Sequence, residues 1–189
     1  MAAEIVRRIF STRPLPPQDA SQDEFKAQFD AAVADFEEGG FMEQTKLPPI
    51  TSEIDLVDKL HDHRGDLVVV KFWKRGCLPC MGLAEMYKAA EKHYKDMAQQ
   101  QQHQQQRTAA PAPPRVVFYS VNTRDASCLS TVAHQLVDGT PSIQLFHQGR
   151  QIGDEVLSMN LASFIAKIDA YAAQYCVGSA AAAPGMATS

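Results

Sequence analysis

Two of the four cysteines stand close enough in the sequence to act together. Cys77 and Cys80 have two residues between them, whereas Cys128 and Cys176 stand alone. A Cys-x-x-Cys pair has three main explanations, which are a redox dithiol, half of a zinc site, and chance in a reduced protein. The neighbouring sequence has to distinguish them.

Metal binding at this pair would require further ligands. Zinc would have to take them from Cys128, Cys176 or the six histidines, but no second close pair has ligand spacing. An iron–sulfur cluster at Cys77 and Cys80 would need partners. The nucleotide-binding fingerprint Gly-x-Gly-x-x-Gly is also missing from the sequence. We therefore predict no metal and no cofactor, buried or incidental thiols at Cys128 and Cys176, and electrons supplied by a partner protein.

The cysteine pair lies where a strand meets a helix. Residues 67–73, Leu-Val-Val-Val-Lys-Phe-Trp, are almost all apolar and predict a strand buried on both faces. After Cys80, apolar residues recur at helical spacing for about four turns. Cys77 would sit at the helix N-terminus, where free N–H groups and the helix dipole favour a thiolate. Pro79 is tolerated in the first turn, and Cys80 would be near enough to close a disulfide.

The other predicted elements form an α/β pattern. A helix capped by Ser52 precedes the buried strand, and its apolar residues are Ile54, Val57 and Leu60. Further elements are expected at 115–121 (strand), 129–136 (helix), 142–147 (strand), up to 156 (strand) and 161–171 (helix).

The length of 189 residues and the hydrophobic content of 45% fit one folded unit with tails. No basic stripe is present, because 18 basic and 22 acidic residues are mixed along the chain, so nucleic acid is not an expected partner. No apolar run reaches the roughly 20 residues of a membrane span. We assign a presequence-like segment at 1–14, a helical extension at 15–46, the main domain at 47–177 with a Gln/Pro-rich exposed insertion at 99–114, and a disordered tail at 178–189.

The first 14 residues have three arginines, hydroxyl side chains and a single acid, which is typical of a mitochondrial presequence. The run Arg8-Ile9-Phe10-Ser11 is also similar to the site at which such presequences are cut. These features predict a mitochondrial location, and the alternative is an uncut extension on a cytoplasmic protein.

A helix is predicted immediately after this segment. Ser21 and Glu24 form a capping box, and Gly39-Gly40 stops the helix. Its apolar stripe consists of Phe25, Phe29, Val33 and Phe36. Such a stripe packs either against its own domain or onto a partner protein.

The order β-α-β-α-β-β-α resembles the thioredoxins over about residues 50–175. The resemblance rests on Val68-Val-Val-Lys-Phe-Trp-Lys-Arg-Gly-Cys-Leu-Pro-Cys80 and on Gly139-Thr-Pro-Ser-Ile-Gln-Leu-Phe-His-Gln-Gly-Arg150. It implies a thioredoxin-like α/β fold, a central mixed sheet flanked by helices, here with an N-terminal helical extension. It also implies a cis bond at Thr140-Pro141 beside the dithiol, where the preceding backbone pairs with substrate, and a packing role for Trp73 against the active-site loop.

The resemblance implies a mechanism in which Cys77 attacks a protein disulfide and Cys80 resolves the mixed disulfide. Three residues depart from the family pattern. Gly76 stands in place of a tryptophan, Leu78 in place of a glycine, and Lys71 in place of a buried acid that moves the proton of the resolving thiol. A desolvated Lys71 would accept that proton, whereas a charged Lys71 would favour thiolates and make the pair more oxidising.

Two functions are therefore predicted. The first is a protein thiol–disulfide oxidoreductase of thioredoxin type, which acts on protein disulfides and whose dithiol is reduced again by a protein reductant. The alternative is a non-catalytic or weakly redox-active subunit of a large mitochondrial assembly, favoured by the phenylalanine stripe, Lys71 and Gly76.

Overall fold

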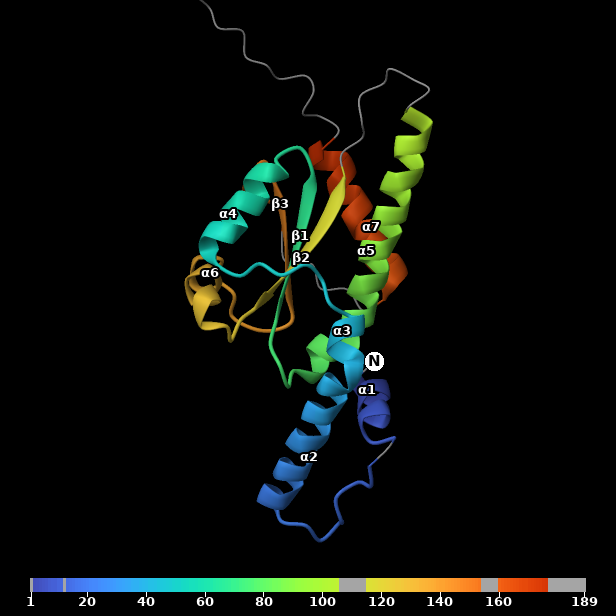
Figure 1. Ribbon diagram of the computed structural model, residues 1–189, viewed down its shortest axis with the longest axis vertical. Helices are drawn as coiled ribbons and strands as arrows, with labels where there is room; N and C mark the ends of the chain where they lie inside the picture. Colours follow the sequence, from blue (N-terminus) through green and yellow to red (C-terminus); the bar gives the residue numbers. More distant parts are fainter. Residues whose placement is uncertain (1, 12, 106–114, 154–159, 177–189) are drawn as a thin grey trace, which may run out of the picture.

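The computed structural model describes residues 2–11, 13–105, 115–153 and 160–176. Within these residues a mixed sheet has the strand order β2-β1-β3-β4 (Figure 1). The strands are β1 (Leu67–Trp73), β2 (Val116–Asn122), β3 (Ser142–His147) and β4 (Arg150–Gln151). β1 pairs with β2 in parallel and with β3 antiparallel. The predicted thioredoxin-like architecture, with a central mixed sheet, is therefore confirmed.

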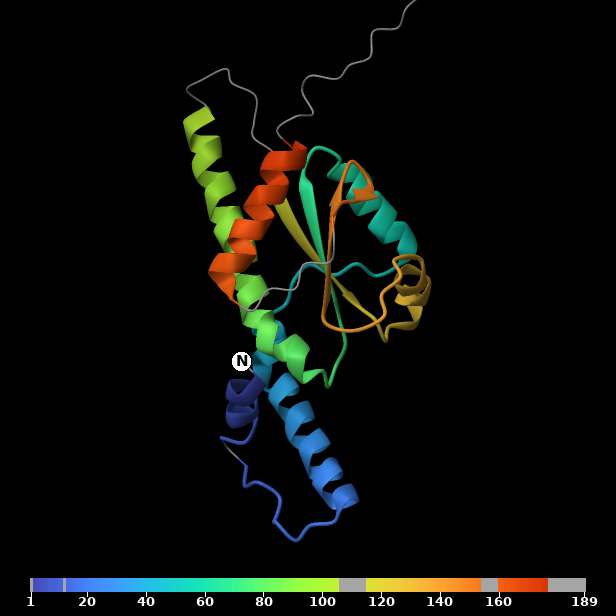
Figure 2. The same cartoon turned by 180° about the vertical axis from the view of Figure 1, so that it is seen from behind.

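The alternation of side chains along β1 divides the core into two layers. Leu67 and Val69 pack against α5 (Leu78–Gln105) and α7 (Leu161–Tyr171). Val70 and Phe72 face the opposite way, toward α4 (Glu53–Asp62) and α6 (Leu129–His134). Figures 1 and 2 show these helix pairs covering the two faces of the sheet. Because both faces are covered, β1 is buried from end to end except at Trp73, and Lys71 must lie on the α5 side with Val69.

Several predicted boundaries need correction. The helix after the cysteines continues through Gln105, beyond its predicted end near residue 98, because glutamine has good helix propensity even without an apolar face. On α4 the buried residues are Leu56 and Leu60, while the predicted Ile54 and Val57 are exposed. β4 ends at Gln151. Ile152 and Gly153 of that predicted strand are not in a strand, and its last residues, 154–156, fall outside the described residues. So do most of the predicted insertion and the predicted disordered tail.

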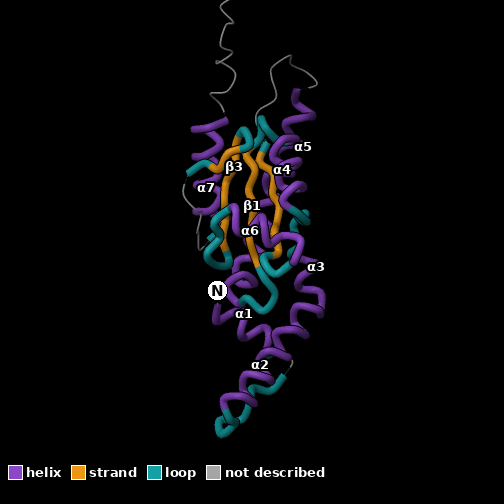
Figure 3. Tube along the Cα trace, turned by 90° about the vertical axis from the view of Figure 1, so that its left-hand side faces the viewer, coloured by secondary structure: helices purple, strands orange, loops and turns teal. Residues whose placement is uncertain are grey.

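In the presequence-like segment the structure has α1 (Ala2–Ile9). The extension at 15–46 comprises α2 (Gln22–Phe36), the π-helical turn η1 (Glu37–Phe41) and α3 (Met42–Gln44). The capping box of Ser21 and Glu24 is confirmed. The predicted stop at Gly39-Gly40 becomes a kink, with Gly40 at a φ of 104° that suits glycine. Figure 3 shows α2 pointing away from the sheet, so this helix meets the domain mainly at its C-terminal end.

A third apolar cluster joins the extension to the first turns of α5. Ile5 and Ile9 of α1 are buried in it with Val33 of α2 and with Met81 and Ala84 of α5. Arg8 ties the same elements together, because its guanidinium bonds the Glu85 carboxylate at 2.8 Å and lies over the rings of Phe36 and Phe41. The presequence-like segment thus contributes a buried helix face to this structure.

The same cluster accounts for most of the phenylalanine stripe. Val33 is buried, and Phe29 and Phe36 pack against the cluster as partly buried side chains. Phe25 alone of the four predicted residues remains largely exposed, at 48%. The stripe therefore packs mainly against its own chain, which was one of the two predicted possibilities.

Candidate functional site

Cys77 caps the N-terminus of α5. This helix begins at Leu78, and the Cys80 backbone N–H donates to Cys77 Sγ across 3.2 Å. An N-cap position and a direct N–H bond both stabilise negative charge on sulfur, so the attacking thiolate expected from the sequence has a physical basis. Cys77 and Cys80 form a disulfide, with their Cα atoms 5.2 Å apart.

The second sequence motif lies directly against Cys77. The Thr140–Pro141 peptide bond is cis, as predicted. The Thr140 carbonyl oxygen lies 3.6 Å from Cys77 Sγ, and the Thr140 hydroxyl is a donor 3.7 Å from the same sulfur. Two surface hollows meet at Thr140, one of them also lined by Pro141 and the other by Lys74. Cys77 Sγ therefore lies beside the residue at which the two hollows meet.

Gly76, Leu78 and Pro79 are the chain neighbours of the two cysteines. Leu78 packs with the cluster that joins α5 to the extension, so the bulky residue between the cysteines has a packing partner in this chain. Pro79 is exposed in the first turn of α5, where a missing N–H costs no helical hydrogen bond. Gly76 has a φ of 70°, a conformation that glycine adopts without strain.

Lys71 is an almost fully buried cation, with 6% of its surface exposed. Its ammonium group lies 5.2 Å from the centre of the Tyr87 ring, an arrangement that attracts a cation to the ring face. Burial lowers the pKa of Lys71 to about 8. In most molecules Lys71 is therefore charged at neutral pH, and above pH 8 it is a neutral base in most of them.

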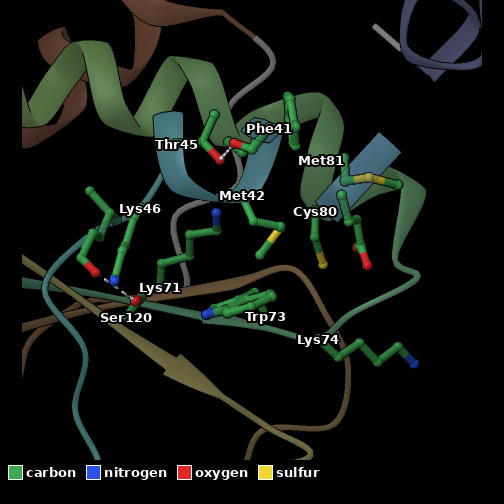
Figure 4. A pocket seen from close by; sticks show the side chains of 13 residues that line it. Phe41, Met42, Thr45, Lys46, Lys71, Trp73, Lys74, Cys80, Met81 and Ser120 are labelled. Atoms are coloured by element: carbon green, nitrogen blue, oxygen red, sulfur yellow. Dashed lines mark hydrogen bonds between the residues drawn. The ribbon is translucent and has the colours of Figure 1, made fainter. Parts of the chain in front are cut away.

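Lys71 and Cys80 line the same cavity, which has a volume of about 50 Å³. Figure 4 shows Lys71 and Trp73 on the strand side of this cavity and Cys80 across it on α5. Met42 of α3 and Ser120 of β2 also line it. This volume is enough for ordered water, so a proton could pass between the Cys80 thiol and Lys71 through water.

The same cavity contains a residue that the sequence analysis missed. Glu37 of η1 is buried, with 5% exposed, and its Oε1 accepts a hydrogen bond of 2.9 Å from the Gly76 N–H. The sequence did carry a signal for it. Glu37 continues the spacing of Phe29 and Val33 by four residues, so an acid falls on the buried side of the helix.

The two remaining cysteines lie away from the dithiol. Cys128 and Cys176 are both buried, as predicted. Burial raises the pKa of both thiols, that of Cys176 to about 11, which keeps them protonated and unreactive at neutral pH. Among the described residues, no group of three or more His, Cys, Asp or Glu side chains is placed to hold a metal ion. No helix in the described ranges is both long enough and apolar enough to span a membrane.

Comparisons with known proteins agree with this geometry. The family model described as Thioredoxin matches residues 55–170. The thioredoxin of Fasciola hepatica is 18% identical, with a TM-score of 0.50 over 66% of this chain and 98% of its own. The thioredoxin of Schistosoma mansoni is 20% identical, with a TM-score of 0.50 over 68% of this chain and 97% of its own. A search of curated protein sequences gives no match.

Proposed function

Since this chain belongs to the thioredoxin family, we propose that it is a protein thiol–disulfide oxidoreductase whose redox centre is the Cys77–Cys80 pair. The observation that carries the proposal is the position of Cys77 Sγ. This sulfur accepts the Cys80 N–H at the start of α5 and also lies within 4 Å of the carbonyl and hydroxyl oxygens of Thr140. A thiolate-stabilising helix end and a backbone segment able to pair with substrate therefore meet at one atom.

The reaction starts from the reduced pair. The Cys77 thiolate attacks one sulfur of a substrate disulfide, a Cys77–substrate disulfide forms, and the other substrate sulfur leaves as a thiolate that takes up a proton. Cys80 then loses its proton and attacks Cys77 Sγ. The substrate gains two electrons and is released reduced, while Cys77 and Cys80 become the disulfide. A protein dithiol reductant restores the pair, and the same steps in reverse oxidise a substrate.

Lys71 has two effects on these steps. As a cation beside the cavity it stabilises thiolates at neutral pH, which favours the reduced pair and makes the disulfide a stronger oxidant. Above a pH of about 8, set by its lowered pKa, it becomes a base able to accept the Cys80 proton. The proton transfer would use the cavity that Lys71 shares with Cys80.

The supporting residues take roles in keeping with their positions. Thr140 and Pro141 form the surface on which a substrate backbone lies against Cys77, and Gly76 leaves the approach to the sulfur open because it has no side chain. Trp73 lines the same cavity as Cys80. No cofactor is part of this proposal.

The trapping of a substrate tests this function. In Cys80→Ser the resolving thiol is missing, so Cys77 should remain covalently joined to a model protein disulfide. Mass spectrometry of the reduced variant, mixed with an excess of the substrate, should find a one-to-one adduct at Cys77. The matched control is Cys128→Ala, which retains both active cysteines and should release its substrate. An adduct at Cys128 or Cys176 instead of Cys77 would rule out the proposed nucleophile.

The assembly-subunit function is the second candidate, with a mitochondrial location proposed from the composition of residues 1–14 and a cytoplasmic one as the alternative. Its main support in the fold is the exposed Phe25, since Phe29 and Phe36 pack partly against the chain's own core. One exposed phenylalanine is a small docking surface. We therefore place the oxidoreductase first.

A further inference from the structure

Glu37 is a buried carboxylate that the extension brings to the redox loop. It lies 39 residues before Gly76 in the chain, yet its Oε1 accepts the Gly76 N–H across 2.9 Å. Gly76 immediately precedes Cys77, and its φ of 70° turns the chain into α5. A buried carboxylate needs strong hydrogen bonds to offset the loss of water, and a backbone N–H supplies one of them. The contact therefore holds both Glu37 and the turn before the nucleophile.

The charge of Glu37 also bears on the sulfurs. Glu37 and Cys80 line the same cavity, and charges in a poorly solvated space interact more strongly than they do in water. A negative charge near a thiol disfavours its ionisation. Glu37 thus acts against the helix end and against Lys71, both of which favour the thiolate.

The other charged groups that line the cavity are cations, so Glu37 is the charge that opposes a thiolate there. The cations that line the cavity are Lys46, Lys71 and Lys74. Lys46 already has a carboxylate partner, since it lies 3.6 Å from Glu43. So do two cations nearby, because Arg75 lies 3.9 Å from Glu38 and Arg8 lies 2.8 Å from Glu85. Glu37 is the only carboxylate among the described residues that line the cavity.

We infer that Glu37 is a positioning residue of the redox pair, supplied by the N-terminal extension to hold the turn before Cys77 and to oppose formation of the thiolate. This inference rests on the proposed function, because it assigns Glu37 to the same Cys77–Cys80 centre. It gives the extension a direct part in the chemistry, in addition to its packing on α5.

The Glu37→Gln variant separates charge from hydrogen bonding, because a glutamine side-chain oxygen still accepts the Gly76 N–H. The full chain is reduced with dithiothreitol, and the rate of alkylation at Cys77 by iodoacetamide is followed by mass spectrometry across the pH range. We expect at least a threefold faster rate at pH values below the Cys77 pKa in Glu37→Gln, and the midpoint of the profile at lower pH. Glu38→Gln is the matched control, since it removes the neighbouring exposed charge, and its profile should stay that of the wild type.

The equilibrium with glutathione gives a second readout. Glu37→Gln should raise the equilibrium ratio of reduced to oxidised pair at least threefold, which is about 14 mV toward a stronger oxidant for a two-electron couple. A variant that matches the wild type within experimental error in both measurements would overturn the inference, and so would an equal shift in Glu38→Gln. If Glu37→Gln does not fold, Glu37→Ala removes the charge together with the hydrogen bond to Gly76, and its alkylation profile should still have its midpoint at lower pH than that of the wild type. The alkylation profile needs no turnover, so it tests Glu37 even if the wild type fails to reduce protein disulfides and the proposed function is thereby refuted.

Discussion

The Cys77→Ser substitution is expected to lower the turnover of protein disulfides by at least about a thousandfold. Cys77 is the sulfur at the start of α5, where it accepts the Cys80 N–H and lies against Thr140. A serine hydroxyl at this place stays protonated at neutral pH and cannot form a mixed disulfide. The measurement is the rate at which the reduced protein, kept reduced by dithiothreitol, reduces the interchain disulfides of insulin above the uncatalysed background.

The control for this prediction is Cys128→Ala. Cys128 is buried on the α4 side of the sheet, and its pKa is raised by burial. Its removal should leave the rate within about twofold of the wild type, provided that circular dichroism shows the variant to be folded. A Cys77→Ser protein that keeps more than a tenth of the wild-type rate would mean that another group carries the reaction.

Lys71→Met is expected to stabilise the protein at pH 7 by about 3 kcal/mol. Burial lowers the pKa of Lys71 from 10.5 to about 8, and a lowering of this size corresponds to roughly 3 kcal/mol of cost for burying the charged form. Methionine is close to lysine in length and carries no charge, so it should keep the packing against Tyr87 and remove this cost. Urea unfolding at pH 7 measures the difference.

The pH dependence of stability is a second test of whether the charged Lys71 destabilises the fold. Between about pH 8 and 10.5 the unfolded chain holds a proton on Lys71 that the folded chain has lost. The free energy of unfolding of the wild type should therefore gain a contribution from this residue as the pH rises through that interval, and Lys71→Met should not show that contribution. Lys92→Met is the control, because Lys92 is 79% exposed and its removal should change stability by no more than about 0.5 kcal/mol. A Lys71→Met protein less stable than the wild type at pH 7 would show that the buried ammonium stabilises the fold.

If this sign is correct, Lys71 is retained at a cost in stability. A buried residue that lowers stability and lines a cavity with Cys80 is better explained by a role in the redox reaction than by a role in folding. Lys71 of the sheet and Glu37 of the extension line one cavity with opposite charges, so the cation favours the thiolate and the carboxylate disfavours it.

The local parts of this site could be predicted from the sequence, whereas the approach of Thr140-Pro141 to Cys77 was predicted only through the family resemblance, because the two lie 63 residues apart. The buried strand before Cys77, the helical period after Cys80 and the Thr140-Pro141 step each depend on residues next to one another in the chain. The exposure of Ile54 and Val57 was not predicted, since Leu56 and Leu60 form an equally regular pair four residues apart and tertiary packing chose between them.

The role of Glu37 was not predicted, because its contact with Gly76 is not local in the sequence. Its contact with Gly76 depends on how α1 and α2 dock on α5, which involves residues far apart in the sequence. The capping box of Ser21 gives the start of α2 but does not say what its end will touch. An acid at the next position of a buried stripe is a usable signal in such cases, because it must be paired or functional where it is buried.

The most direct test of the central claim is the reduction potential of the Cys77–Cys80 pair in the wild-type protein. The protein is equilibrated in glutathione buffers of defined ratio, quenched with acid, alkylated, and analysed by mass spectrometry for the fraction of disulfide. The account predicts a reversible two-electron transition between about −270 and −120 mV, the interval spanned by known dithiol oxidoreductases. A pair that stays oxidised down to potentials below about −300 mV would behave as a structural disulfide, and that result would contradict the account.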